Sequence, residues 1–330
     1  MKAFTYDRPT DLAAAATLFE TPGSALLAGG TNLVDLMKIG VAEPDSLVDV
    51  GALGLDAVEF DDAGTLSAGA YARNSDLAAD PRVMARFPVL SQALLAGASG
   101  QLRNAATTGG NIMQRTRCPY FMDVHKPCNK REPGSGCPAR EGFHRMHAIL
   151  GASEACIAVN PSDMAVALAA LDAVVVVTDG ADGERRIELK DFHRLPGTEP
   201  DRETTLRAGE IIVRVEIPAL PAATNSTYRK VRDRASYAFA VVSVAAVLRI
   251  DEGVVSDVRI AFGGVAHQPW RARVAESAIR GEPPTRTAFA AGVARELEAA
   301  ETLPQNAFKV PLLQSVATSV LTELAEEESR

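Results

Sequence analysis

All four cysteines of this chain fall within one polar stretch, where they could hold a metal. Their spacing is C-x9-C-x8-C-x18-C, with sulfur atoms at Cys118, Cys128, Cys137 and Cys156. Thiolates are strong ligands for soft metals, and four of them are the usual donor set of an iron–sulfur cubane. Prolines and the Gly134–Gly136 turn predict a loop over residues 113–147. Because long loops in compact domains are usually functional or disordered, we interpret this stretch as metal-binding.

Positive side chains gather around the first two thiols. They are Arg115, Arg117, Lys126 and Lys130. Nearby cations lower the pKa of a thiol and stabilise its thiolate. We therefore predict that these side chains promote ionisation of the thiols and offset the negative charge of a bound cluster.

Other interpretations of the cysteines stay open. A zinc site is one, with His144 or His147 as additional ligands, although structural zinc sites usually have tighter cysteine pairs than these. Disulfides are another, if the protein works in an oxidising compartment. Cys156 lies in the apolar segment Ala155–Val159 and is the thiol most compatible with simple burial in a core.

Two glycine pairs with similar flanks precede the cysteines, in Leu27–Asn32 and Thr107–Asn111. Glycine lets a backbone approach a diphosphate closely, and successive N–H groups in a turn bind anions. The first pair follows an expected strand and opens an expected helix, which is favourable for phosphate. Two such loops would suit a large dinucleotide such as FAD. The alternative is that each pair is only a tight turn, and no GxGxxG motif supports a Rossmann fold.

Two further polar residues have both a structural and a functional interpretation. Asp163 follows Pro161-Ser162 at the start of an apolar helix, so it is a candidate cap, or a polar contact to a cofactor. Lys230 lies in a charged run that would normally be a solvated face, but it could direct one cation at a flavin. We identify no catalytic base.

These residues need a mixed α+β framework to position them. Apolar periodicity and capping residues predict helices and strands along most of the chain outside the cysteine-bearing stretch. The expected helices are 11–20, 32–39, 74–79, 89–96, 161–171 and 312–326, and the expected strands are 25–28, 46–50, 65–68, 174–177, 211–217, 238–248 and 254–262. Pro218, Pro221 and the polar residues after them predict a domain boundary, giving domains 1–222 and 223–330.

Bulk composition limits the classes of function. The chain has 330 residues, is 47% hydrophobic and 23% charged, and carries a net charge of −8, so nucleic acid and anionic membranes are unexpected partners. No apolar run reaches the ~18 residues that a membrane span needs. The N-terminus lacks the apolar region of a secretion signal, which makes the cytoplasm the default compartment unless a partner directs export of a folded complex.

Several motifs together resemble one family, in family order and over essentially the whole chain. They are Leu26–Leu33, Thr107–Asn111, Pro161–Asp163, Lys230 with Ser236–Val244, and Phe262–Arg271. The chain resembles the FAD-binding subunits of the xanthine dehydrogenase and carbon monoxide dehydrogenase group of molybdenum hydroxylases. The cysteine-bearing insertion is most similar to that of bacterial periplasmic aldehyde oxidoreductases, whose FAD subunit carries a [4Fe–4S] cluster. A similar insertion occurs in 4-hydroxybenzoyl-CoA reductase.

The resemblance implies a two-lobed PCMH-type FAD-binding domain, with an iron–sulfur insertion at 113–156, followed by an α+β C-terminal domain. It implies FAD contacts by Leu26, Leu27, Ala28, Gly29, Gly30, Thr31, Asn32, Leu33, Thr107, Thr108, Gly109, Gly110, Asn111, Asp163, Ile212 and Lys230. It also implies that Cys118, Cys128, Cys137 and Cys156 ligate the [4Fe–4S] cluster.

The same resemblance implies an electron-transfer role in a heterotrimer. A large molybdopterin-binding subunit would oxidise an aldehyde to a carboxylic acid, and a small subunit with two [2Fe–2S] centres would pass the electrons to FAD. An external acceptor would then receive them, and the complex would work in the periplasm or, alternatively, the cytoplasm. The alternatives are the flavin subunit of another molybdenum hydroxylase, a zinc-stapled scaffold without redox function, and a free-standing flavin oxidase.

Overall fold

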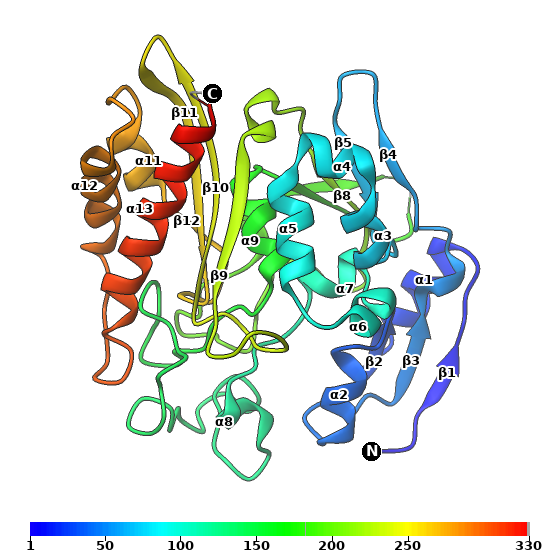
Figure 1. Ribbon diagram of the computed structural model, residues 1–330. Coiled ribbons are helices and arrows are strands. Elements are labelled where there is room, and N and C mark those ends of the chain that lie inside the picture. The colour runs from blue at the N-terminus through cyan, green and yellow to red at the C-terminus, as the bar shows by residue number, and fades with distance from the viewer. Residues whose placement is uncertain (182, 329–330) are drawn as a thin grey trace.

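The computed structural model describes residues 1–181 and 183–328, which form three sheets with helices packed between and beside them (Figure 1). The first sheet is parallel, with three strands in the order β1-β3-β2. Asp11 caps the helix that packs on this sheet, because its Oδ1 accepts a 2.8 Å hydrogen bond from Ala14 N. The elements of this part are β1 Thr5–Asp7, α1 Leu12–Phe19, β2 Ser24–Leu27, α2 Leu33–Lys38, β3 Ser46–Asp49 and η1 Val50–Ala52.

The second sheet has five strands in the order β4-β5-β8-β6-β7, all in antiparallel pairs. Its strands are β4 Val58–Phe60, β5 Leu66–Gly69, β6 Val174–Thr178, β7 Arg185–Glu188 and β8 Ile211–Ile217. The accompanying helices are α3 Asn74–Ala79, α4 Pro81–Arg86, α5 Pro88–Ala96, α6 Gly100–Ala105, α7 Thr108–Ile112, α9 Asp163–Ala170 and α10 Leu189–Phe192. Val175, Val177 and Val215 from this sheet join Leu90 and Leu168 from the helices in one apolar core.

The third sheet is antiparallel, in the order β12-β11-β10-β9. Helix α13 packs on one face together with α11 and α12, and helices α5 and α9 pack on the other, so the sheet is buried on both sides (Figure 1). Its elements are η2 Pro221–Thr224, β9 Ser226–Val231, β10 Val242–Asp251, β11 Val254–Gly263, β12 Trp270–Arg271, α11 Arg273–Ile279, α12 Arg286–Leu297 and α13 Lys309–Glu328.

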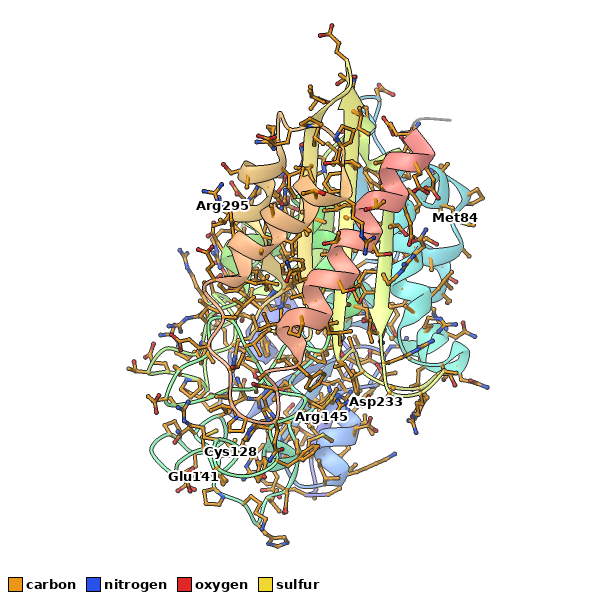
Figure 2. The ribbon with its side chains drawn as sticks, turned by 60° about the vertical axis from the view of Figure 1, so that its left-hand side comes forward. Met84, Cys128, Glu141, Arg145, Asp233 and Arg295 are labelled. Carbon is orange, nitrogen blue, oxygen red and sulfur yellow. The ribbon has the colours of Figure 1, made fainter. Side chains whose placement is uncertain are left out.

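The cysteine-bearing insertion lies at one end of the molecule, below the third sheet in Figure 1. Its one helix among the described residues is α8, Pro119–Met122, so the loop expected from its prolines is found. Figure 2 shows Cys128 and Glu141 at this end, and Arg145 beside Asp233, with which it forms a 3.1 Å ion pair. Within the part of the chain that the structure describes, no helix combines the length and apolarity that crossing a bilayer requires.

Most predicted elements are confirmed within a few residues, but one motif is not the expected turn. Most of this motif lies in the short helix α7, Thr108–Ile112, with Thr107 as its cap. Thr107 Oγ1 accepts a 3.2 Å hydrogen bond from Gly110 N. Gly109 packs closely on Ala70. A Cβ at this position would lie 3.2 Å from the Ala70 carbonyl oxygen, so the close packing favours a residue without a side chain.

Candidate functional site

Four distant segments of the chain meet around one cavity of about 200 Å³, which we call the motif cavity. The first glycine motif contributes Thr31 and Asn32, and the second contributes Gly110 and Asn111. Asp163 at the start of α9 and Lys230 on β9 line the same space. The structure therefore brings together these six residues, which the sequence placed in one binding site.

The remaining residues of the glycine motifs shape the wall behind this cavity. A Cβ on Gly29 would lie 1.9 Å from the Ala105 carbonyl oxygen, so the lack of a side chain permits close contact with the end of α6. Gly30 has φ +71°, a conformation that favours glycine. Thr108 Oγ1 donates a 3.1 Å hydrogen bond to Ala72 O. These contacts fix the two motifs against neighbouring elements.

Unsatisfied polar atoms in the motif cavity indicate a polar ligand. Asn32 Oδ1 accepts a 3.0 Å hydrogen bond from Arg115 N, but Asn32 Nδ2 is buried without a partner among the described residues. Asn74 Oδ1 and Arg117 Nε, on residues that line the same cavity, are also buried and unpaired there. Buried polar groups are almost always hydrogen-bonded in folded proteins. The free donors and acceptor thus fit a ligand that carries both hydrogen-bond acceptors and a donor.

Asp163 and Lys230 form a buried ion pair at the edge of the motif cavity. Lys230 Nζ lies 2.7 Å from Asp163 Oδ2, and the two side chains are 4% and 10% exposed. Tyr228 donates its hydroxyl to the other carboxylate oxygen, and burial followed by the charge of Asp163 raises the pKa of Tyr228 well above its ordinary value. Ser162, rather than Asp163, caps α9 by accepting a 2.9 Å hydrogen bond from Ala165 N.

Ile212 is the one predicted flavin contact that the structure places in the apolar core. It lies on β8, paired with Val177, and is 7% exposed. It does not line the motif cavity, whose described walls come from other residues. Its predicted contact with a flavin stays a prediction.

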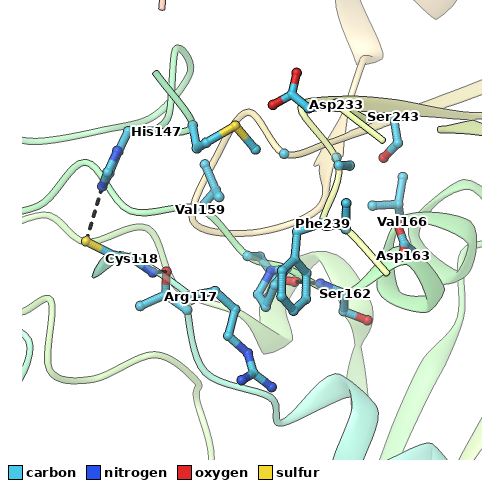
Figure 3. A pocket seen from close by; sticks show the side chains of 18 of the residues that line it. Arg117, Cys118, His147, Val159, Ser162, Asp163, Val166, Asp233, Phe239 and Ser243 are labelled. Atoms are coloured by element: carbon cyan, nitrogen blue, oxygen red, sulfur yellow. Dashed lines mark hydrogen bonds between the residues drawn. The ribbon is translucent and has the colours of Figure 1, made fainter. Parts of the chain in front are cut away.

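A second cavity of about 270 Å³ adjoins the first, and we call it the junction cavity. Both cavities are lined by Arg117, Asp163 and Phe239. The Arg117 guanidinium lies 5.3 Å from the centre of the Phe239 ring, so these side chains stand together where the cavities meet (Figure 3). Sequence analysis did not assign Phe239 to the site, because an isolated phenylalanine does not distinguish a cavity wall from a core residue.

The four thiols converge on a third space, the thiol cavity, of about 10 Å³. It is lined by Cys118, Cys128, Cys137 and Cys156, which come from distant positions in the insertion. All four are free cysteines, which gives no support to the disulfide alternative. Cys118 and His147 line both the thiol cavity and the junction cavity, so the two spaces are adjacent (Figure 3).

The predicted net lowering of thiol pKa values by nearby cations is not found at Cys118, Cys137 or Cys156. Burial raises the pKa of Cys118 to about 11, with the nearby Cys128 and Cys137 adding to the effect. Burial likewise raises the pKa of Cys137, and it raises that of Cys156 to about 12.

The cations are engaged elsewhere. Lys130 Nζ lies 2.7 Å from Glu203 Oε1, and Arg115 Nε lies 2.8 Å from Glu203 Oε2. Lys126 is exposed at the surface. Lys130 lowers the pKa of Cys156, but less than burial raises it. Without metal the three buried thiols are therefore protonated at neutral pH, and they would release protons on ligating one.

The described residues around the thiol cavity form no ready-made site for a single metal ion. No three His, Cys, Asp or Glu side chains in residues 1–181 and 183–328 are arranged to hold one metal ion. His147 Nε2 lies 3.1 Å from Cys118 Sγ, and burial, followed by the charges of Lys309 and His144, lowers the pKa of His147 to about 4. His144 instead accepts a hydrogen bond from Gln305 N at 3.1 Å.

Two families match consecutive parts of the chain. Residues 2–220 match the family described as FAD binding domain in molybdopterin dehydrogenase. Residues 226–324 match the CO dehydrogenase flavoprotein C-terminal domain.

Individual relatives extend over nearly the same length. The chain is 52% identical over 326 residues to the aldehyde oxidoreductase FAD-binding subunit PaoB of Escherichia coli K12, covering 98% of each chain. It is 28% identical to the glyceraldehyde dehydrogenase medium chain of Sulfolobus acidocaldarius, covering 84% of this chain and 82% of that one. A chain of the carbon monoxide dehydrogenase from Hydrogenophaga pseudoflava has a TM-score of 0.73 at 26% identity, covering 97% of this chain and 95% of that one.

Proposed function

This chain belongs to the family of FAD-binding subunits of the molybdenum hydroxylases, and we propose that it carries electrons from an aldehyde-oxidising partner to an external acceptor. The similarity to PaoB and to the glyceraldehyde dehydrogenase medium chain favours aldehydes as the substrate class. Oxidation of an aldehyde to a carboxylic acid, with water as the source of the added oxygen atom, releases two electrons and two protons. In this proposal the bond changes occur in a large molybdopterin-binding subunit, and a small subunit with two [2Fe–2S] centres delivers the electrons to this chain.

The observation that carries the proposal is the arrangement of the three cavities: the junction cavity adjoins the motif cavity on one side and the thiol cavity on the other. The motif cavity would hold FAD, with Thr31, Asn32, Gly110 and Asn111 as candidate contacts to its polar groups. Bound FAD would supply two-electron chemistry that can also proceed in single-electron steps. Asp163 and Lys230 would present a paired charge to the flavin, and the apolar faces of Phe239 and Ala238 would exclude water beside it.

We also propose that the four cysteines hold a [4Fe–4S] cluster. Its support is the convergence of four thiols on one cavity within the insertion. Lys130 and Arg115 would keep the insertion closed through Glu203, and Lys309 would join it to α13. Because Cys118 and Asp163 both line the junction cavity, a cluster held by the four cysteines would lie near the proposed flavin site.

Metal and flavin content of the purified protein tests this function directly. The full chain is co-expressed with its inferred partners, purified anaerobically, and analysed by visible spectroscopy and by quantitation of flavin, iron and zinc. We expect FAD, and iron in the proportion that one [4Fe–4S] cluster adds to the partner's centres. Zinc in place of this iron would favour the scaffold alternative, and absence of flavin would overturn the proposal.

A variant then separates a relay from a purely structural cluster. In Cys128→Ser, which removes one proposed ligand, a relay predicts slower flavin reduction by aldehyde in a complex that still retains its flavin. Unchanged kinetics would leave the cluster a structural role. Aldehyde oxidation by the isolated chain would instead favour a free-standing oxidase. Export of the complex to the periplasm stays a prediction, which fractionation of cells would test.

A further inference from the structure

A histidine faces one of the proposed cluster ligands. His147 Nε2 lies 3.1 Å from Cys118 Sγ, at the boundary between the thiol cavity and the junction cavity (Figure 3). The His147 side chain is buried, with the residue 2% exposed. Its other ring nitrogen, Nδ1, is buried without a hydrogen-bond partner among the described residues.

The environment of the His147 ring favours Nε2 as the donor and the Cys118 sulfur as the acceptor of this hydrogen bond. A neutral imidazole has one N–H donor and one acceptor nitrogen. A metal-bound thiolate has no proton to donate, so a bond between these atoms requires the proton on Nε2. No described residue offers Nδ1 an acceptor that would stabilise the opposite tautomer. The ring is therefore suited to donate Nε2–H to the Cys118 sulfur.

The backbone of His147 is held firmly from two directions. Lys309, at the start of α13, is 0% exposed and donates from Nζ to His147 O at 2.9 Å and to Gly264 O at 2.7 Å. Asn306 Nδ2 donates to the carbonyl of the next residue, Ala148, at 3.0 Å. The C-terminal part of the chain thus fixes the position of the ring against the thiol.

We propose that His147 is a positioning residue that donates a hydrogen bond to the Cys118 thiolate and raises the reduction potential of the cluster. The inference rests on the proposed function, since it needs the cluster. Hydrogen bonds to ligand sulfurs are among the determinants of cluster potential. The donor stabilises the reduced cluster more, because that state carries more negative charge on its sulfur atoms. The bond also lies on the side of the cluster that faces the junction cavity.

Redox titration of the full complex, followed by electron paramagnetic resonance, tests this role. His147→Leu removes the donor, and His147→Gln keeps an N–H of similar reach. His125→Leu is the matched control, because His125 is an exposed histidine of the same insertion that does not line the thiol cavity. For His147→Leu we expect the oxidised-to-reduced ratio at a fixed potential to rise about tenfold, a negative shift of about 59 mV for a one-electron couple. His147→Gln should shift less, and His125→Leu should not shift.

The outcomes separate this inference from the proposed function. If the native complex lacks the iron of this cluster, the proposed function fails. If the iron is present and His147→Leu keeps both the iron and the native potential, only the present inference is overturned.

If His147→Leu loses its cluster, the hydrogen bond is tested in native protein labelled with ¹⁵N-histidine. Pulsed electron paramagnetic resonance then measures the coupling between the cluster and an imidazole nitrogen. A weak coupling to an imidazole nitrogen, absent from His147→Gln, would support the hydrogen bond. No coupling, or one strong enough for direct iron ligation, would overturn it.

Discussion

Lys230 Nζ lies 2.7 Å from Asp163 Oδ2, joining β9 of the third sheet to the first residue of α9. Both side chains are nearly inaccessible to solvent, and Lys230 also donates to Ala96 O at 3.2 Å. The pair therefore connects the carboxyl end of α5, the start of α9 and the third sheet at the rim of the motif cavity. At the proposed FAD site, stability and cofactor binding would be coupled, because the same two side chains line the cavity and hold its walls.

Removing one member of this pair should weaken both properties. Lys230→Met leaves Asp163 buried without its cation, and breaking a buried ion pair costs about 3–5 kcal/mol. We expect a loss of this size in the free energy of unfolding by denaturant, and less FAD in the purified protein. Lys190→Met is the control, since the Lys190–Glu188 pair is 58% and 64% exposed and should contribute less than about 1 kcal/mol. Equal effects of the two substitutions would contradict the prediction.

Gly29 offers a separate test of how the first glycine motif is built. A Cβ there would lie 1.9 Å from the Ala105 carbonyl oxygen, so Gly29→Ala must push the motif away from α6. We expect a loss of at least about 2 kcal/mol in unfolding free energy, as for other overpacked sites, together with lower flavin content. Gly100→Ala is the matched control, because it adds the same methyl group on α6 with no atom within 4 Å. Thermal unfolding that is the same for both variants would show that the motif is not packed in this way.

Sequence patterns predicted local features of this molecule well where the cause is local. The helix at 74–79 and the strand at 211–217 follow from short-range periodicity, whereas the cap of α9 proves to be Ser162 and not Asp163. The pKa values of the cysteines did not follow, because burial depends on how the insertion folds back on itself. Nothing near Lys130 in sequence indicates that its ammonium group would form an ion pair with Glu203. The same applies to Phe239, whose place beside Arg117 exists only after the third sheet has packed against α9.

Glu203 is expected to hold the insertion against the FAD-binding part of the chain. Its two carboxylate oxygens pair with Lys130, whose side chain is 1% exposed, and with Arg115, which is 30% exposed. Burial alone would raise the pKa of Glu203, but the two cations outweigh it and lower the pKa. Glu203→Gln would leave the buried Lys130 ammonium without a counterion, at a cost of about 3–5 kcal/mol.

The consequences of Glu203→Gln should concentrate in the insertion. We expect faster hydrogen exchange and proteolysis there, with less iron retained. Glu199→Gln is the control, because Glu199 is 51% exposed, about twice as much as Glu203, and pairs with Arg194. Native-like protection of the insertion in Glu203→Gln would show that the pair does not hold it.

The shifted pKa of Lys309, at the junction of the insertion and α13, should make the free energy of unfolding depend on pH. Burial, with a smaller contribution from Arg145, lowers the pKa of Lys309 from 10.5 to about 7. Between these two values the unfolded chain binds more protons at this residue than the folded chain, so the contribution of Lys309 to stability rises with pH. Below about pH 7 both states are protonated there and this slope disappears.

Lys309→Met removes the titrating group and leaves the carbonyls of His147 and Gly264 without this donor, at about 1–3 kcal/mol each. Unfolding free energies of the native and Lys309→Met proteins, measured by denaturant from pH 6 to pH 10, should therefore diverge above pH 7, at about 1.4 kcal/mol per pH unit. Because the thiols titrate in both proteins, their contribution largely cancels in the difference. A gap that stays constant over this range would mean that Lys309 keeps an ordinary pKa in the folded protein.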